Sequence, residues 1–396
     1  MMGGLLSGVR VLDLTRMLAG PYGSLLLADL GAEVIKIEEP REGDGTRLMG
    51  PRAGGESAYF VSINRNKKSL TLNLKDDRGR AIFYELVRRA DVVYDNFRPG
   101  ILERLQCDYA TLKRVNPRII ACSVSAFGQD GPYKDLPAFD LILQAMGGAM
   151  SITGEPGRPP VRMGIPLGDL AGGMFAAFAI TAALYRRQLT GQGERIDLSL
   201  LDCQVSLLTY VAQYYLVTGE VPGPIGSAHQ SVVPYQAFRT RDIDIVVAIF
   251  VEKFWERLCR ILGRPELARD PRFETNAGRL EHKAELLPIL EQAFLERTGD
   301  EWIEILWKEE IPAAPINTVD RVLADPQVRQ RQMVVEVNHP AAGGALRMVG
   351  NPVKVTEAEE AGYAPSPTLG AHTDDILRSL GYTAAQIAEW REAGVI

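Results

Sequence analysis

The chain has 396 residues, of which 46% are hydrophobic and 24% charged, and its net charge at pH 7 is −6. The hydrophobic content excludes a disordered chain, and the negative balance argues against a nucleic-acid-binding protein, which would show a basic excess. Anionic small molecules stay possible as ligands because they need only a few well-placed cations. The length predicts about two domains. The four cysteines form no CxxC pair, so they predict neither a metal site nor a disulfide framework.

The sequence also bears on where the protein is expected to reside. Residues Met1–Arg10 lack the basic and apolar regions of a secretory signal peptide. The longest uncharged stretches, Leu170–Tyr185 and Cys203–Gly219, are shorter than the roughly 20 apolar residues that a membrane span needs. We therefore expect a cytoplasmic protein that does not enter a membrane.

The first half of the chain alternates short β-branched runs with helical patterns. This alternation predicts parallel βαβ units, and hence an α/β fold with a Rossmann-like sheet covered on both faces. Strands are predicted at Val9–Leu14, Glu33–Glu38, Val92–Asn96, Arg118–Ser125 and Arg195–Leu200. Helices are predicted at Pro21–Leu30, Asp76–Arg89, Ile101–Val115, Asp140–Met146, Leu170–Arg187 and Leu201–Thr218.

The second half of the chain differs from the first in composition and in its predicted elements. Residues 219–226 are rich in Gly and Pro and mark a linker, and a second linker is expected at 311–333. Between them, residues 226–320 predict a smaller α+β domain. Its expected elements are a hairpin at Ala237–Arg241 and Asp244–Phe250, then helices at Phe254–Leu262, Leu280–Arg297 and Asp300–Glu309. Short strands from Val334 and helices at Thr373–Leu380 and Thr383–Ala393 end the chain.

Ligands of a doubly wound sheet bind at the carboxyl ends of its strands, so the loops there are informative. The first such loop, Leu14–Tyr22, lacks the GxGxxG pattern, which counts against an NAD or FAD enzyme. Asn96–Gly100 follows a strand, and its Arg98 together with Arg104 suits a phosphate-bearing ligand, although a solvated charge pair is the alternative. The four cations of Asn64–Lys75 are interpreted as a basic surface.

Asp169 stands at the start of an apolar helix, with glycines on both sides. It could be an N-cap that satisfies free backbone N–H groups. The alternative is a nucleophile, with adjacent N–H groups stabilising an oxyanion. His229, in the segment Gly226–Tyr235, has no second His nearby and is interpreted as a loop histidine rather than a metal ligand.

Taken together, several segments resemble the class III CoA-transferases, also called the formyl-CoA transferase or carnitine CoA-transferase family. The resemblance covers essentially the whole chain. The matching segments are Val11–Pro21, Leu30–Glu38, Asn64–Ser69, Asn96–Gly100, Gly128–Pro132, Leu167–Asp169 and Leu369–Leu377.

The resemblance implies an interlocked homodimer in which each chain has a discontinuous large domain, residues 1–220 and 330–396. It implies that Asp169 is the nucleophile and that coenzyme A is a substrate rather than a permanently bound cofactor. The residues that it assigns to CoA binding are Arg16, Met17, Leu18, Ala19, Leu72, Lys75, Asn96, Phe97, Arg98 and Arg104. Some relatives carry a basic residue where this chain has Glu39, and the glycine-rich lid of the formyl-CoA enzyme has no counterpart, so formyl-CoA and oxalate are not the expected substrates.

The expected reaction moves CoA between carboxylic acids through an aspartyl anhydride and an aspartyl-CoA thioester. One alternative, an α-methylacyl-CoA racemase-like isomerase, needs a His ahead of the Asp, where this chain has Phe139 followed by Asp140. A non-catalytic CoA-binding protein is the other alternative, against which the retained Asp169 argues. Residues 226–238 resemble members that use succinyl-CoA with glutarate-type dicarboxylic acids. Arg16, Phe139, Asp140, His229 and Gln230 are the candidate substrate contacts.

Overall fold

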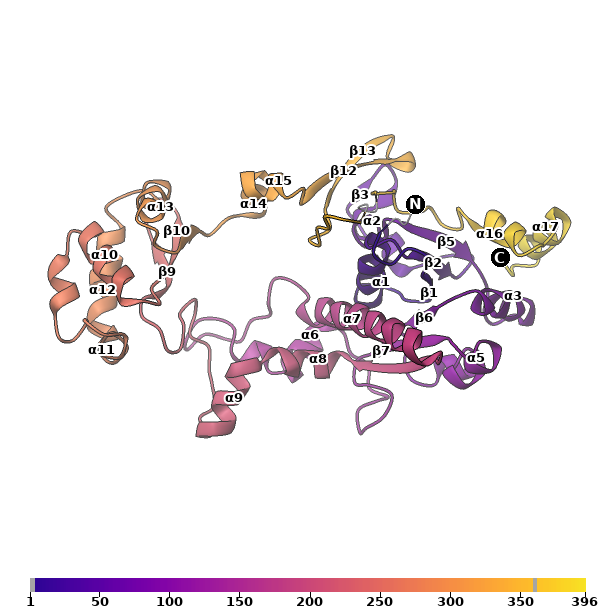
Figure 1. Ribbon diagram of the computed structural model, residues 1–396, viewed down its shortest axis with the longest axis horizontal. Coiled ribbons are helices and arrows are strands. Elements are labelled where there is room, and N and C mark those ends of the chain that lie inside the picture. Colours follow the sequence, from indigo (N-terminus) through magenta and orange to yellow (C-terminus); the bar gives the residue numbers. More distant parts are fainter. Residues whose placement is uncertain (1–3, 359–361) are drawn as a thin grey trace. The chain divides into compact units, whose positions relative to one another are not determined.

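The structure, a computed structural model, describes residues 4–358 and 362–396. Its contacts divide the chain into two units, which are described separately. Unit 1 contains residues 1–150, 162–220 and 329–396, and unit 2 contains residues 151–161 and 221–328. The short piece 151–161, expected in the large domain, groups instead with unit 2, where the backbone N–H of Gly226 donates to the carbonyl of Gly154 at 2.9 Å. Figure 1 colours the chain from indigo at the N-terminus to yellow at the C-terminus, so the segments that make up each unit can be followed.

Unit 1 is built on a six-stranded sheet in which every neighbouring pair is parallel, in the order β5-β2-β1-β6-β7-β8. This is the doubly wound order, whose direction reverses between β1 and β6. The expected Rossmann-like α/β class is therefore confirmed. The strands are β1 (Arg10–Asp13), β2 (Glu33–Glu38), β5 (Lys67–Thr71), β6 (Val92–Asp95), β7 (Ile120–Ser125) and β8 (Glu194–Ser199).

Strand β5 corrects the interpretation of residues 64–75 as a basic surface. The side chains of Arg65 and Lys67 are almost fully buried. Arg65 pairs with Asp29 from α1 (Ala19–Asp29), and the Lys67 ammonium lies 3.3 Å from a carboxylate oxygen of Asp13. Two of the four cations, Arg65 and Lys67, are buried because carboxylates 36 and 54 residues away in the sequence neutralise them. The other two, Lys68 and Lys75, are exposed.

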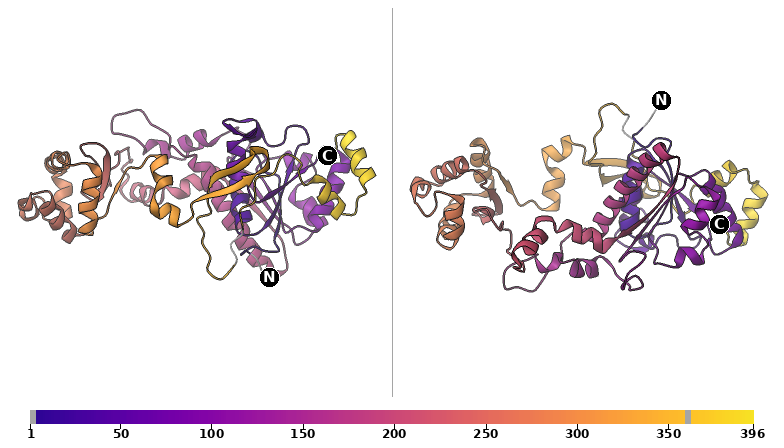
Figure 2. Two further views of the ribbon diagram at one scale, coloured as in Figure 1. Left: turned by 90° about the horizontal axis from the view of Figure 1, so that it is seen from above. Right: turned by 60° about the horizontal axis from the view of Figure 1, so that its bottom comes forward.

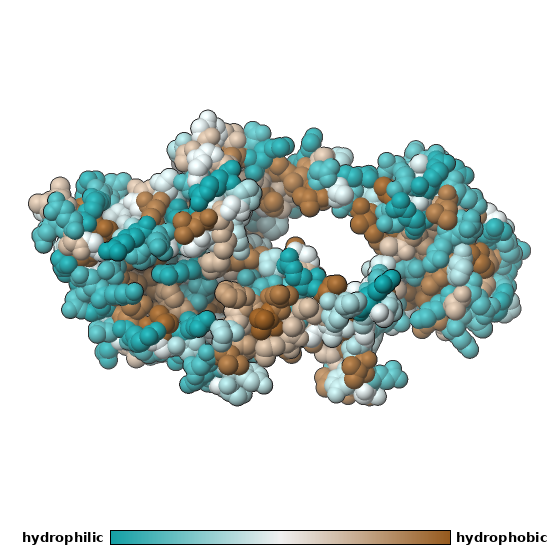
Figure 3. Space-filling view, turned by 180° about the vertical axis from the view of Figure 1, so that it is seen from behind, coloured by the Kyte–Doolittle hydropathy of each residue, from teal (hydrophilic) through white to brown (hydrophobic). Residues whose placement is uncertain are grey.

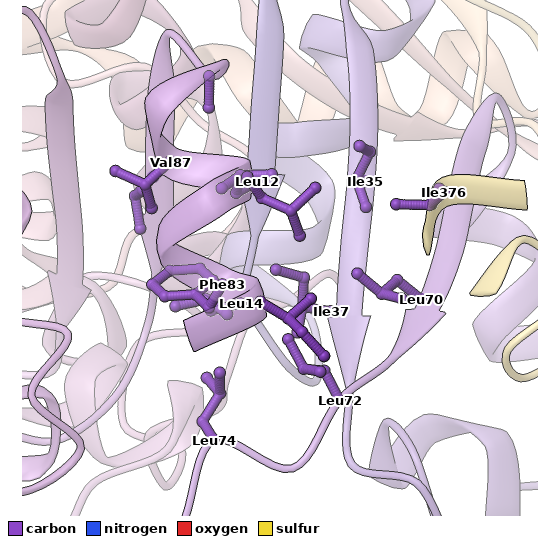
Figure 4. Packing of buried hydrophobic residues seen from close by; sticks show 14 of the residues in the cluster. Leu12, Leu14, Ile35, Ile37, Leu70, Leu72, Leu74, Phe83, Val87 and Ile376 are labelled. Atoms are coloured by element: carbon purple, nitrogen blue, oxygen red, sulfur yellow. The ribbon is translucent and has the colours of Figure 1, made fainter. Parts of the chain in front are cut away.

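Alternate residues of the strands face opposite sides of the sheet, so each face has its own core. Leu12 and Ile35 belong to the core that packs under α3 (Asp77–Arg88) and the C-terminal helices α16 (Thr373–Ser379) and α17 (Ala384–Glu392). Figure 4 shows this core, including Ile376 from α16. The other face is covered by α1 and α7 (Leu167–Thr190), which is the long magenta helix in Figure 2. The C-terminal segment thus packs on unit 1.

Helix α7 is, among the described residues, long and apolar enough to cross a membrane by length and composition alone. Its 24 residues exceed the uncharged stretch that the sequence analysis measured. In the structure its small residues face α1: a Cβ added to Gly173 would lie 2.6 Å from the carbonyl oxygen of Ala19. Within unit 1, one side of α7 therefore packs in the core, and 44% of its most apolar window is buried.

Two predicted helices are each divided in the structure. The first becomes α4 (Ile101–Arg104) and α5 (Tyr109–Val115), because Gln106 is left-handed and the Asp108 side chain caps α5. The second becomes α8 (Leu200–Leu207) and α9 (Thr209–Thr218), with a break at Thr209, whose φ is +44°. Helix periodicity alone does not detect such single-residue breaks.

Unit 2 contains a three-stranded antiparallel sheet in the order β11-β10-β9 and a core around Trp255 and Trp302. Its elements are β9 (Tyr235–Arg239), β10 (Asp244–Ala248), α10 (Glu252–Ile261), α11 (Asn276–Glu281), α12 (Lys283–Phe294), α13 (Gly299–Lys308), β11 (Ala313–Pro315) and α14 (Val319–Ala324). The remaining elements of unit 1 include β3 (Arg52–Ala53), β4 (Glu56–Ser57), α2 (Ala58–Asn64), α6 (Asp140–Met146), β12 (Val334–His339) and β13 (Gly344–Val349). Helix α15 (Pro326–Gln330) spans the boundary between the units.

Candidate active site

The loops after β1 and β6 are joined across the point where the strand order reverses. The backbone N–H of Arg16 donates to the Asn96 side-chain oxygen at 2.8 Å, and the Asn96 amide donates back to the Arg16 carbonyl at 2.8 Å. These two bonds fix Asn96 and Arg16 at the edge of the sheet where a doubly wound fold binds its ligand.

A cavity of about 780 Å³ opens at this edge and is lined by the carboxyl ends of β1, β2, β5 and β6. It brings together seven of the residues that were expected to bind CoA: Arg16, Leu72, Lys75, Asn96, Phe97, Arg98 and Arg104. Sequence reasoning missed a further cation in its wall, Arg80, which donates to the carbonyls of Leu74 and Lys75. Two carboxylates also line it, and one of them, Glu38, is neutralised by Arg47.

A second cavity, of about 230 Å³, contains Asp169. Its wall includes the other three expected CoA residues, Met17, Leu18 and Ala19, together with Phe139 and Lys134. Four residues line both cavities: Arg16, Asn96, Phe97 and Arg98. The cationic crevice and the carboxylate therefore share a wall within unit 1.

Asp169 is not the N-cap of α7. It lies in the first turn of the helix, and Pro166 occupies the N-cap position without a side-chain hydrogen bond. The capping group comes from Asp140, whose Oδ1 accepts from the backbone N–H of Gly168 at 2.8 Å and of Asp169 at 3.3 Å. The N–H groups that were expected to be free for an oxyanion are thus occupied by a carboxylate in this structure.

The end of α7 is tightly packed around Gly168. A Cβ at this position would lie 2.6 Å from Nε2 of Gln204 and 3.1 Å from Oδ1 of Asp140, so a larger residue would displace these two side chains. The Gln204 amide is buried, and neither its nitrogen nor its oxygen has a hydrogen-bond partner among the described residues. Gln144 holds Asp140 in place by donating to its Oδ2 at 2.7 Å.

The environment of Asp169 favours its protonated form. Burial, followed by the negative charge of Asp140, raises the pKa of Asp169 to about 7. Burial also raises the pKa of Tyr59 on α2, and the negative charge of Asp169 adds to this shift. Sequence reasoning missed Tyr59 because no local pattern distinguishes it. A carboxylate with a pKa near neutral is typical of a group with a chemical role.

Buried charged side chains stabilise the loop that leads into α1. The Lys36 ammonium donates to the Thr15 carbonyl at 2.7 Å and lies 2.9 Å from a carboxylate oxygen of Asp44. The other oxygen of Asp44 accepts from the backbone N–H of Met17 at 3.2 Å. Met17 has a φ of +67°, which is unusual for a residue with a side chain. The ion pair thus stabilises a strained turn beside Arg16.

Two candidate substrate residues, His229 and Gln230, lie in unit 2. The Nδ1 atom of His229 accepts from the backbone N–H of Ser231 at 3.0 Å, and its ring contacts Tyr235 and Phe250. No group of three or more His, Cys, Asp or Glu side chains in the described ranges could hold a metal ion.

The fold and the site define a doubly wound α/β protein with a cationic crevice at the switch point of its sheet and a partly buried carboxylate beside it. The chain matches the family model described as CoA-transferase family III over residues 6–373. It belongs to this family and is an enzyme of this class, as the resemblance predicted.

Relatives and a solved structure agree with this assignment. The chain is 40% identical to a Homo sapiens protein named succinyl-CoA:glutarate CoA-transferase, over 99% of this chain and 90% of that one. It is 42% identical to an Acetobacter aceti protein named acetyl-CoA:oxalate CoA-transferase, over 88% of each. The crystal structure of a CAIB/BAIF family protein from Brucella suis superimposes with a TM-score of 0.86 at 38% identity, covering 96% of this chain and all of that one.

Proposed function

We propose that this protein transfers CoA from succinyl-CoA to a dicarboxylic acid of the glutarate type, with Asp169 as the nucleophile. The observation that carries the proposal is that four residues line both the cavity of Asp169 and the larger, cationic cavity. The names of the human and Acetobacter relatives support an acyl-CoA donor and a dicarboxylic acid acceptor. CoA is a substrate in this proposal, and no permanently bound cofactor takes part.

An activated acyl bond, either an anhydride or a thioester, is kept at every step of the reaction. The Asp169 carboxylate attacks the thioester carbonyl of the donor, the C–S bond breaks, and CoA leaves as a thiolate. The thiolate then attacks the aspartyl carbonyl of the mixed anhydride, which releases the donor acid and forms an aspartyl-CoA thioester. The acceptor carboxylate displaces the thiolate to form a second anhydride. Attack of the thiolate on the acceptor acyl carbonyl then gives the new thioester and restores Asp169.

Each step passes through a tetrahedral oxyanion that needs hydrogen-bond donors. The backbone N–H groups of Gly168 and Asp169 are suitably placed on α7, but Asp140 accepts from both. In our proposal the Asp140 carboxylate leaves these groups when the oxyanion forms. The unpartnered Gln204 amide beside Gly168 is a further donor at this end of the helix.

We further propose that the protein is a cytoplasmic homodimer without a membrane attachment. Helix α9 has no buried residue in the isolated chain, and apolar side chains of α9 and of the outer side of α7 are exposed. In Figure 3 brown side chains gather on the protruding α9. Exposed apolar side chains on this scale are typical of a protein–protein interface, and a second copy is the partner that the family resemblance suggests.

The test is to trap the first intermediate. Wild-type protein incubated with succinyl-CoA and hydroxylamine, without an acceptor, should form a hydroxamate at Asp169 and lose activity, because hydroxylamine attacks activated acyl groups. The Asp169→Asn variant should neither be modified nor transfer CoA, whereas Asp130→Asn, an exposed carboxylate of the loop after β7, should behave like the wild type. A wild-type protein that shows no hydroxylamine-sensitive acyl group would falsify the proposal.

A further inference from the structure

The smaller cavity contains a cation that no motif identifies, Lys134, on the loop that follows β7. We infer that Lys134 binds the distal carboxylate of a dicarboxylic acyl group held at Asp169, and thereby selects dicarboxylic over monocarboxylic acids. The inference rests on the proposed transferase function and names the residue that sets its substrate class.

Three cations line the cavity of Asp169, namely Arg16, Arg98 and Lys134. The first two also line the larger crevice, where Arg16 stands over the Phe97 ring at 5.5 Å from its centroid. Lys134 lines only the cavity of Asp169. Because the phosphates of CoA occupy the crevice in the proposed complex, Lys134 is the cation that stays available for the acid.

The wall that accompanies Lys134 is apolar. Leu136, Ala138 and Phe139 follow it on the same loop, and Leu18 faces the cavity from the loop before α1. An ammonium group, an apolar wall and a reactive carboxylate match the three parts of a dicarboxylic acyl group, which are a distal carboxylate, methylene groups and a reacting carbonyl. Small-molecule sites typically combine an apolar lining with a few such polar groups.

Charge balance gives an independent reason for a cation here. A dicarboxylic substrate adds a negative charge to a cavity that already holds Asp169 and, at the end of α7, Asp140. Burial, followed by the negative charge of Asp140, raises the pKa of Asp169 to about 7. Lys134 is exposed at the rim of this cavity, where its positive charge would offset part of the repulsion between the carboxylates.

The character of the residue also fits acids of different length. A lysine places a compact charge on a flexible four-carbon stem, so its ammonium group can follow a distal carboxylate over some distance. The loop that carries it contains two glycines with positive φ, Gly128 at +87° and Gly131 at +86°. No carboxylate in the described parts of the chain forms an ion pair with Lys134, so binding breaks no existing one.

The test compares glutarate with pentanoate, which has the same chain length but lacks the distal carboxylate. We expect Lys134→Met to lower kcat/KM for glutarate about 10- to 100-fold, the effect of losing one charged hydrogen bond, and to leave transfer between butyryl-CoA and pentanoate unchanged. Lys134→Arg should recover most of the activity with glutarate. Lys113→Met, which removes a cation of α5 that lines neither cavity, should change neither substrate.

The outcomes separate this inference from the proposed function. If the wild type transfers CoA but Lys134→Met affects glutarate and pentanoate equally, or affects neither, Lys134 does not select the acid and the inference is wrong. If the wild type transfers CoA to no acid, the proposed function fails first. Where transfer to pentanoate is too slow to measure, inhibition constants of pentanoate and glutarate supply the same ratio. A thermal melt of each variant shows whether a loss reflects unfolding.

Discussion

At the scale of single residues, the relation between Asp140 and Asp169 determines how the site works. Asp140 caps α7 and at the same time places a negative charge beside Asp169, the proposed nucleophile. The cap stabilises the helix, while the charge keeps Asp169 partly protonated near neutral pH. Since only the carboxylate form can attack a thioester, the two effects of Asp140 oppose each other in the resting enzyme.

This relation predicts the pH dependence of the enzyme. The pKa of Asp169 is about 7, so kcat/KM should rise with pH, with an inflection near 7 and a plateau above it. Asp140→Asn removes the second cause of the raised pKa but keeps an oxygen that can accept from Gly168. We therefore expect the inflection to move to lower pH, although not as far as the ordinary value of 3.8, because burial remains.

The measurement is a pH profile of kcat/KM for succinyl-CoA, with Asp130→Asn as the matched control. The control variant should keep the wild-type inflection. An Asp140→Asn inflection that stays in place or moves to higher pH would show that the charge of Asp140 does not act on Asp169.

Sequence reasoning reached some of these residues and not others. Asp169 was found because a family motif surrounds it, but its local context equally fitted an N-cap. The ambiguity could not be resolved from the sequence, because the group that does cap α7, Asp140, is 28 residues before Gly168 in the chain. Lys134 carries no local pattern, and its place beside Asp169 is seen only when the loops are folded around one cavity.

At the scale of elements, the buried charges under the first loop decide whether the site keeps its shape. Lys36 on β2 is fully buried, where it holds the Thr15 carbonyl and pairs with Asp44. Periodicity predicted β2 correctly, yet nothing in the sequence distinguishes Lys36 from a lysine on the solvent side. Strand β5 was missed for the same reason, since its cations suggested a surface and their carboxylate partners lie elsewhere in the chain.

This arrangement predicts that substituting two lysines of the same sheet has very different effects on the free energy of unfolding. Lys36→Met leaves Asp44 buried without its cation, so the free energy of unfolding should fall by about 3–5 kcal/mol. Lys68→Met, on β5, breaks only a partly exposed pair with Glu33 and should cost less than about 1 kcal/mol. Urea denaturation of both variants measures the difference. Equal costs would mean that the Lys36 pair does not support the loop.

At the scale of the whole molecule, length and composition predicted two parts. The chain passes from unit 1 to unit 2 between residues 220 and 221, within the Gly- and Pro-rich segment 219–226. The return of the C-terminal helices to unit 1 came only from the family resemblance. Residues 151–161 were predicted to lie in the large domain, whereas the structure groups them with unit 2. The contacts that decide this, such as the hydrogen bond between Gly226 and Gly154, join points about 70 residues apart in the chain. No local signal reports contacts over that distance.

The assembly is the property of the whole molecule that is most open to a direct test. Phe178 on α7 is 71% exposed and Leu216 on α9 is 72% exposed in the single chain, although both are large apolar residues. If these surfaces meet a second copy, Phe178→Glu combined with Leu216→Glu should convert the dimer into a monomer, because two charges per chain would be buried without partners.

Leu5→Glu, which changes an apolar residue of similar exposure near the amino terminus, should leave the mass unchanged. Light scattering after size-exclusion chromatography measures the mass. A wild-type protein that is already monomeric, or a double variant that stays dimeric, would exclude these helices as the interface.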